Sequence, residues 1–217
     1  MALVRKPMFG FMPRRGNYGT RWRRGLFGGI GGASFPATGI LDNFNRTNEG
    51  PPPSASYTTP EGVAGLNVIG NAIGGASSDG YATWNTSYAT DQENALTLTV
   101  PPLNGQAVRL MVRQQSATLF RDCYYAEFVS NTPAPATLRI WKRVVITDTQ
   151  LGADITLAAD LTTQQLGIRV MGTTITAYLD GFLLGTRTDG DVAGAGRLMI
   201  NFTDTTTRGD NFRGGAV

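Results

Sequence analysis

The sequence has no histidine and only one cysteine, Cys123. A single thiol cannot form an internal disulfide. Without imidazole there is no Cys/His zinc cluster and no Ser-His or Cys-His catalytic pair. Because Cys123 stands beside two tyrosines, we expect it to be a buried apolar packing residue. The chain is also compatible with folding in a reducing compartment.

Long apolar runs are missing as well, and only 16% of the residues are charged. No stretch approaches the roughly 20 apolar residues needed to cross a bilayer. Residues 25–36 (GLFGGIGGASFP) follow basic residues, as the apolar part of a signal peptide would, but their glycines interrupt the helical block that such a signal requires. We therefore expect neither a membrane partner nor a cleaved signal.

Acidic residues are absent before Asp42, although seven of the 19 basic residues lie there. Residues 42–217 are left with 12 basic and 16 acidic residues, a formal charge of −4. The two parts of the chain thus carry opposite charge, which favours different partners for each.

Residues 1–38 mix arginine, glycine and aromatic residues without a helical or alternating period, so we predict an extended N-terminal arm. Its many apolar side chains favour contact with another surface rather than full solvation. Arginines that meet carboxylates of a neighbouring subunit and aromatic anchors in pockets would make it a docking strap. If the arginines instead bind phosphates and the aromatic rings stack on bases, the arm would bind nucleic acid. We favour docking, by Arg14, Arg15, Tyr18, Arg21, Trp22, Arg23 and Arg24, with Phe9, Phe11 and Phe27 as apolar anchors.

From residue 40 onward, apolar side chains alternate with polar ones, the pattern of strands with one buried face. The clearest runs lie at residues 96–100, 108–113, 165–170, 174–179 and 198–202. Turn pairs separate such runs at Gly70-Asn71, Gly172-Thr173 and Asp180-Gly181, and short turns join antiparallel neighbours. Residues 39–217 are therefore predicted to be one all-β domain, a two-sheet antiparallel sandwich of roughly a dozen strands.

Several segments of this domain occur in a characteristic order. They are ILDNFNRTNEGPPP, AGLNVIGNAIGG, DGYATWN, DQENALTLTV, VMGTTITAYLDGFLLGTRTD and AGAGRLMINFTDTTTRGDNFRGG. Together they resemble concanavalin A-like (laminin-G-like) jelly-roll domains, of the kind found in tailed-bacteriophage virion proteins and bacterial surface proteins. The likeness covers about residues 40–215. It implies that the first strand, near Asp42, lies beside the last, near Asp210, with Phe44 and Phe212 paired in the core.

The resemblance also suggests chemistry that can be compared with the residues. Glycosidases of this superfamily place carboxylates along one strand. Asp91 and Glu93 come nearest, but a third acid is absent, so we predict a protein that is not an enzyme. Laminin-G-like domains commonly bind calcium. No dense ligand loop is present here, so we assign no metal site. Calcium binding is left as an alternative, with oxygen ligands from Asp79, Asp180, Asp189, Asp191, Asp204 and Asp210.

Glycan binding would need an exposed aromatic side chain with polar groups beside it. Trp141, in the run LRIWKR, lies opposite Leu138 and Ile140 and is flanked by charged residues, so we expect it to be exposed. Trp141 is the candidate for contact with a glycan.

The favoured function is a structural virion protein of a tailed bacteriophage, made in the host cytoplasm. Such a capsid decoration or head- or tail-attached protein would be tethered by its arm to capsid or tail subunits, and we expect it to be a homo-oligomer. The alternative is a carbohydrate-binding module for attachment to a host-surface glycan. Nucleic acid is the less favoured partner of the arm.

Overall fold

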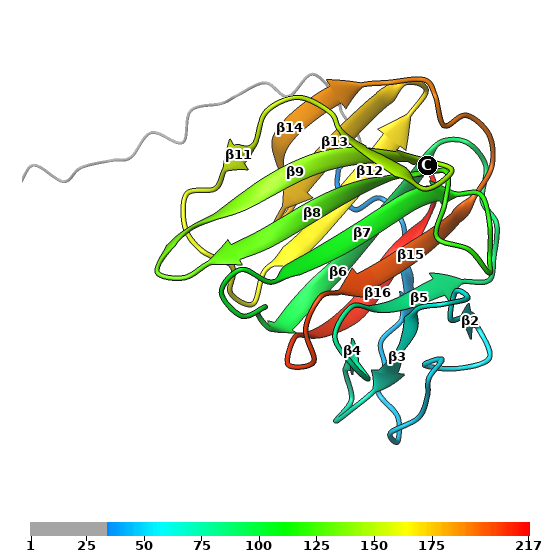
Figure 1. The fold of residues 1–217 in the computed structure, drawn as a ribbon, viewed down its shortest axis with the longest axis vertical. Coiled ribbons are helices and arrows are strands. Elements are labelled where there is room, and N and C mark those ends of the chain that lie inside the picture. The colour runs from blue at the N-terminus through cyan, green and yellow to red at the C-terminus, as the bar shows by residue number, and fades with distance from the viewer. Residues whose placement is uncertain (1–33) are drawn as a thin grey trace, which may run out of the picture. The chain divides into compact units, whose positions relative to one another are not determined.

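A computed structural model of the protein describes residues 34–217. This part of the chain contains sixteen strands and no helix, and therefore no helix that could span a membrane. The strands form two layers packed face to face, as Figure 1 shows for β7, β8 and β9 in front of β12 and β13. The predicted all-β jelly-roll sandwich is confirmed for these residues.

The first sheet is built around the long central strands β6 and β16. Its strand order is β14 (Phe182–Thr188), β13 (Thr174–Leu179), β12 (Gln165–Met171), β6 (Gln92–Val100), β16 (Arg208–Ala216), β4 (Ile73–Gly75) and β3 (Ala64–Val68), with β1 (Ile40–Asp42) paired to β16.

The second sheet contains a meander of three consecutive strands, β7, β8 and β9. Its strand order is β10 (Thr147–Gln150), β9 (Ala134–Val144), β8 (Cys123–Asn131), β7 (Ala107–Gln114), β15 (Arg197–Phe202), β5 (Gly80–Trp84) and β3, with β2 (Tyr57–Thr58) on β5 and β11 (Ile155–Thr156) on β9.

The core lies between the two sheets and is filled by the apolar half of each alternating run. Leu96, Leu110, Phe128, Ile168 and Ile200 are among its fully buried members. Each large side chain removed from water in this way contributes roughly 1.5–3 kcal/mol. The polar half of each run is left on the outer faces of the sandwich.

The three predicted turn pairs are confirmed. Gly70 and Asn71 join β3 to β4 with φ angles of 59° and 62°, and Asp180 and Gly181 join β13 to β14 with φ angles of 50° and 79°. Consecutive left-handed residues match the twist of a tight hairpin. Gly172, with φ of 56°, begins the turn between β12 and β13.

The two ends of the domain meet as predicted. Strand β1 pairs antiparallel with β16, and Asp42 lies opposite Phe212. Phe44 and Phe212 are fully buried, and each ring centroid lies within 6.3 Å of that of Tyr57.

One strand pair departs from the antiparallel expectation. Strands β3 and β5 run parallel, with Gly65 opposite Tyr81. The reason is that β4 lies between them in the chain and reverses its direction first. Because β3 also pairs with β4, it joins the two sheets along one edge.

Residues 34–38, the last of the predicted arm, lie on the outer face of the first sheet. The Phe35 ring stacks on Tyr178 with a centroid distance of 3.9 Å, directly over Gly167. The backbone nitrogen and hydroxyl of Thr38 donate to Glu93 Oε1, each at 2.6 Å. Arg169 pairs with the other Glu93 oxygen, so residues 34–38 cover the part of this face around Glu93 and Arg169. Residues 1–33 lie outside the described part of the chain.

The absence of a side chain at Gly167 is predicted to be necessary for this contact. A Cβ atom there would lie 2.0 Å from Phe35 Cζ. Gly167→Ala should therefore lower the free energy of unfolding in urea by about 1–3 kcal/mol, the usual cost of overpacking. Gly39→Ala is the control, because nothing lies within 4 Å of its Cβ position. In a Phe35→Ala background the cost of Gly167→Ala should be smaller, and an equal cost in both backgrounds would contradict the assignment.

Candidate functional site

The outer face of the second sheet carries a row of polar side chains across five neighbouring strands. Strand pairing brings these residues opposite one another in turn: Tyr81 on β5, Asn201 on β15, Arg109 on β7, Glu127 on β8 and Arg139 on β9. Beside it runs a second row, formed by Thr83, Met199, Met111, Tyr125 and Trp141. One face thus carries a polar row next to a sulfur-containing and aromatic row, of which Arg109, Arg139 and Trp141 are the partly exposed members and the others are buried.

Glu127 is the centre of the polar row. Its Oε1 accepts a hydrogen bond from Arg109 Nε at 2.8 Å, and its Oε2 accepts one from Trp141 Nε1 at 3.2 Å and one from Arg139 Nη1 at 3.4 Å. Burial disfavours the charged form of Arg109, but the adjacent Glu127 outweighs it and raises the pKa of this guanidinium. Glu127 and Arg109 are therefore held as an ion pair in fixed orientation, which is suited to hydrogen bonding with a ligand.

In the aromatic row Tyr125 is buried, whereas Trp141 and the neighbouring Phe120 are partly exposed. Trp141 stacks on Tyr125 with a centroid distance of 6.0 Å and an interplanar angle of 10°. Phe120, from the loop between β7 and β8, meets Tyr125 edge-on, and Arg143 lies 4.1 Å from its ring centroid. Cys123, two residues before Tyr125 on the same face of β8, is fully buried in this cluster, as predicted, and burial raises the pKa of its thiol.

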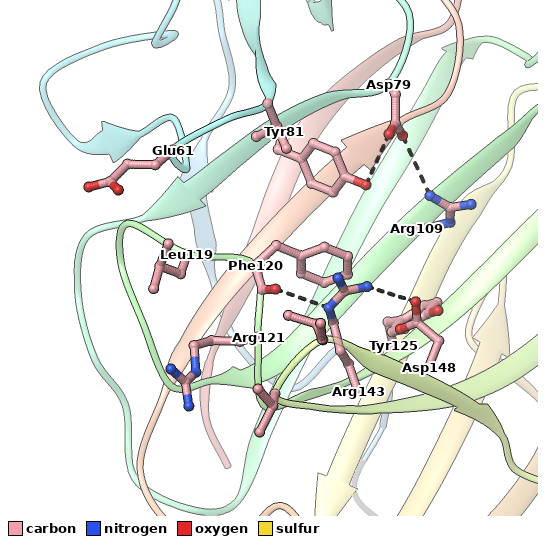
Figure 2. A pocket seen from close by; sticks show the side chains of 13 residues that line it. Glu61, Asp79, Tyr81, Arg109, Leu119, Phe120, Arg121, Tyr125, Arg143 and Asp148 are labelled. Carbon is pink, nitrogen blue, oxygen red and sulfur yellow. Dashed lines mark hydrogen bonds and ion pairs between the residues drawn. The ribbon is translucent and has the colours of Figure 1, made fainter.

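A hollow of about 490 Å³ opens on this face (Figure 2). Its volume falls in the range of small-ligand pockets. Figure 2 shows Asp79 facing both Tyr81 and Arg109, and Arg143 between Phe120 and Asp148. The walls are formed by Glu61, Val63, Asp79, Tyr81, Arg109, Leu119, Phe120, Arg121, Tyr125, Arg143, Val145, Ile146 and Asp148.

Two loops meet at one side of the hollow, and Asp122 links them. The Asp122 carboxylate accepts a hydrogen bond from the backbone nitrogen of Val145 at 2.6 Å, and this bond lowers the pKa of Asp122 from 3.8. Val145 has a φ of 57°, a left-handed conformation that is a true outlier for a β-branched residue. Leu119, Val145 and Ile146 are exposed along this side, and the Ile146 side chain is 77% exposed.

The structure places Trp141 on the outer face of β9, away from the buried Leu138 and Ile140, as the alternation predicts. Its side chain is partly buried against Tyr125, however, and is not fully exposed as expected. Its contact with a glycan stays a prediction. The predicted docking residues of the arm (Phe9, Phe11, Arg14, Arg15, Tyr18, Arg21, Trp22, Arg23, Arg24 and Phe27) all lie outside residues 34–217, and their role also stays a prediction.

The carboxylates weighed for catalysis serve structural contacts. Glu93 is fully buried between Arg169 and Thr38 on the other sheet, and Asp91 accepts a hydrogen bond from the backbone nitrogen of Gly172. Among residues 34–217 no three acidic or cysteine side chains gather in a way that could hold a metal ion. The calcium candidates in this range take part in turns and ion pairs, as Asp204 does with Thr206 and Thr207. Calcium binding stays untested.

Sequence reasoning missed most of this site. Alternation alone indicates that Arg109, Tyr125 and Glu127 point away from the core, because Leu110 and Ala126 are buried between them. The alignment of these residues with Trp141 depends on the register between strands, and the position of Phe120 depends on a loop.

No protein-family model matches the chain, and no curated protein does either. Solved structures do resemble it. The carbohydrate-binding module CBM66 from Bacillus subtilis is 19% identical with a TM-score of 0.60, over 74% of this chain and 96% of that one. A Bacillus licheniformis beta-glucanase is 10% identical with a TM-score of 0.58, over 82% and 98%. A galectin-like protein of unknown function from Bacillus subtilis is 9% identical with a TM-score of 0.53, over 82% and 96%.

At these identities the likeness establishes the fold. Residues 34–217 form a jelly roll of the concanavalin A-like and galectin-like type, as the sequence resemblance implies. The similar structures include both a binding module and a glycosidase, so the fold alone does not separate the two activities. That distinction depends on the residues of the outer face.

We predict that the link between the two loops weakens in acid. The folded-state pKa of Asp122 is lowered, so its stabilising effect is present above the unfolded value near 3.8 and is lost as the pH falls through the folded value. Asp122→Asn keeps an acceptor but removes the charge, and should lower the free energy of unfolding by about 1 kcal/mol at pH 7. Urea titrations at pH 7 and pH 3 should show this difference shrinking at pH 3. A difference that does not change with pH would contradict the assignment.

Proposed function

We propose that the protein is a glycan-binding module and that the outer face of the second sheet is its binding site. The observation that carries the proposal is the pair of adjacent rows on this face, with Trp141 stacked on Tyr125 beside the hydrogen-bonding groups of Arg109, Glu127 and Arg139. Aromatic rings receive the C–H faces of sugar rings, and oriented polar groups receive their hydroxyls. Carbohydrate-binding proteins among the similar structures support the same choice.

Binding without hydrolysis is the activity that the site supports. A glycosidase needs one carboxyl group as an acid and a second as a base or nucleophile. The buried acid of the polar row, Glu127, is bonded to Arg109, Arg139 and Trp141. On the first sheet, Glu93 is held by Arg169 and Thr38. We infer that these carboxylates orient groups and do not transfer protons.

A role in a virion stays a separate prediction. It rests on residues 1–33, which the structure does not describe, and on the resemblance of the domain to phage modules. If it holds, a glycan on the host surface is the ligand to test first.

Trp141→Ala should weaken glycan binding about 10-fold or more, because a Trp at the centre of a binding surface contributes a large share of the affinity. A glycan array followed by calorimetry on the bound glycans measures the effect. Trp141→Phe should retain part of the affinity, because it preserves the ring face and loses the hydrogen bond to Glu127.

Phe182→Ala is the matched control, since Phe182 is 76% exposed on β14 of the first sheet. The bound glycans should not be cleaved on prolonged incubation. Absence of glycan binding by the unmodified domain, or equal loss with Phe182→Ala, would refute the proposal.

A further inference from the structure

We propose that the hollow selects neutral glycans that carry a methyl group, as acetamido and 6-deoxy sugars do, and that Val145 and Ile146 recognise that group. This inference rests on the proposed function and adds the class of glycan. Three observations support it: the balance of charge in the hollow, an exposed aliphatic rim, and a strained backbone at that rim.

Each arginine that lines the hollow is already paired with a carboxylate, whereas the lining Glu61 makes no ion pair within residues 34–217. Three guanidinium groups and three carboxylates lie in its walls. Arg109 lies 3.5 Å from Asp79, Arg143 lies 2.7 Å from Asp148, and Arg121 is paired with the neighbouring Asp122 at 2.7 Å. An acidic sugar would have to displace one of these carboxylates from its arginine. A neutral sugar can instead accept and donate hydrogen bonds while every pair stays intact.

The rim beside these pairs is aliphatic. Leu119, Val145 and Ile146 border the hollow, and the Ile146 side chain is 77% exposed. Figure 2 shows Leu119 and Phe120 on the same side of the hollow as Arg121. Branched aliphatic side chains offer no flat face to a sugar ring, but they can bury a methyl group. Each methyl group removed from water gains free energy in proportion to its buried area.

The tight hairpin between β9 and β10 calls for a left-handed residue at position 145, but it does not call for a β-branched side chain there. Val145 adopts a φ of 57°, which glycine or asparagine would adopt at lower cost. The bond from its backbone nitrogen to Asp122 holds this conformation, and that bond would form with any residue except proline. Strained residues of this kind cluster where a ligand is bound. The valine side chain is therefore assigned to ligand contact.

The test compares matched sugars that differ by the methyl-bearing group. For the acetamido group, calorimetry compares the affinity for a trisaccharide of N-acetylglucosamine with that for a glucose trisaccharide of the same linkage. For the 6-deoxy group, it compares 6-deoxygalactose with galactose. The unmodified domain should bind the methyl-bearing member of at least one pair about 10-fold more tightly, near the lower end of what a hydrophobic contact contributes to discrimination. Ile146→Ser should reduce this preference to about 2-fold or less. Phe182→Ser, which removes an equally exposed side chain on the other sheet, should leave the preference unchanged.

Val145→Asn separates recognition from structure. Asparagine tolerates the left-handed conformation, so Tm should rise by about 2–4 °C while the preference falls. A lower Tm with an unchanged preference would assign Val145 a structural role and overturn the inference.

Other outcomes distinguish this inference from the proposed function. Tightest binding to an acidic glycan, lost with Trp141→Ala, would overturn the inference and leave the proposed function standing. Binding of neither sugar of either pair, nor of any glycan on an array, would overturn both. Analytical ultracentrifugation tests whether the rim is instead an interface between copies. If Ile146→Ser converts a dimer into a monomer and leaves the sugar preference unchanged, the inference is overturned.

Discussion

The burial of one face of every strand determines what the other face presents. In β7 and β8, Leu110 and Ala126 point into the core, so Arg109, Met111, Tyr125 and Glu127 point outward. A slip of β8 by one residue relative to β7 would turn Tyr125 and Glu127 toward the core and Ala126 away from it. The requirement for an apolar core therefore also sets the composition of the proposed binding face, and a change in the register of the meander would alter both.

This constraint explains how much of the structure the sequence could predict. Alternation and turn chemistry are local, so the strands, the hairpins at residues 70–71 and 180–181, and the outward position of Trp141 could all be predicted. The pairing of β1 with β16 came from the resemblance. The polar row could not be predicted, because β15 and β7 are adjacent in the sheet but distant in the chain.

The remaining features depend on tertiary contacts that leave no periodic signal. Phe35 belongs to a segment without alternation, and only the bare backbone of Gly167 shows why the ring can lie there. Phe120 lies in the connection between β7 and β8, and Val145 in the connection between β9 and β10. The two connections contact each other, for example through the hydrogen bond from the Val145 backbone nitrogen to Asp122. The parallel pairing of β3 with β5 follows from the short β4 between them in the chain, which alternation does not place.

The contacts of residues 34–38 also bear on how the domain could be presented. The chain enters the sandwich on the outer face of the first sheet, where Thr38 bonds to Glu93, whereas the polar and aromatic rows lie on the opposite layer. A label, solid support or carrier joined directly at Ser34 would therefore be attached on the layer opposite the proposed binding face. Immobilisation at Ser34 is the geometry that would leave the proposed binding face turned toward the surrounding medium.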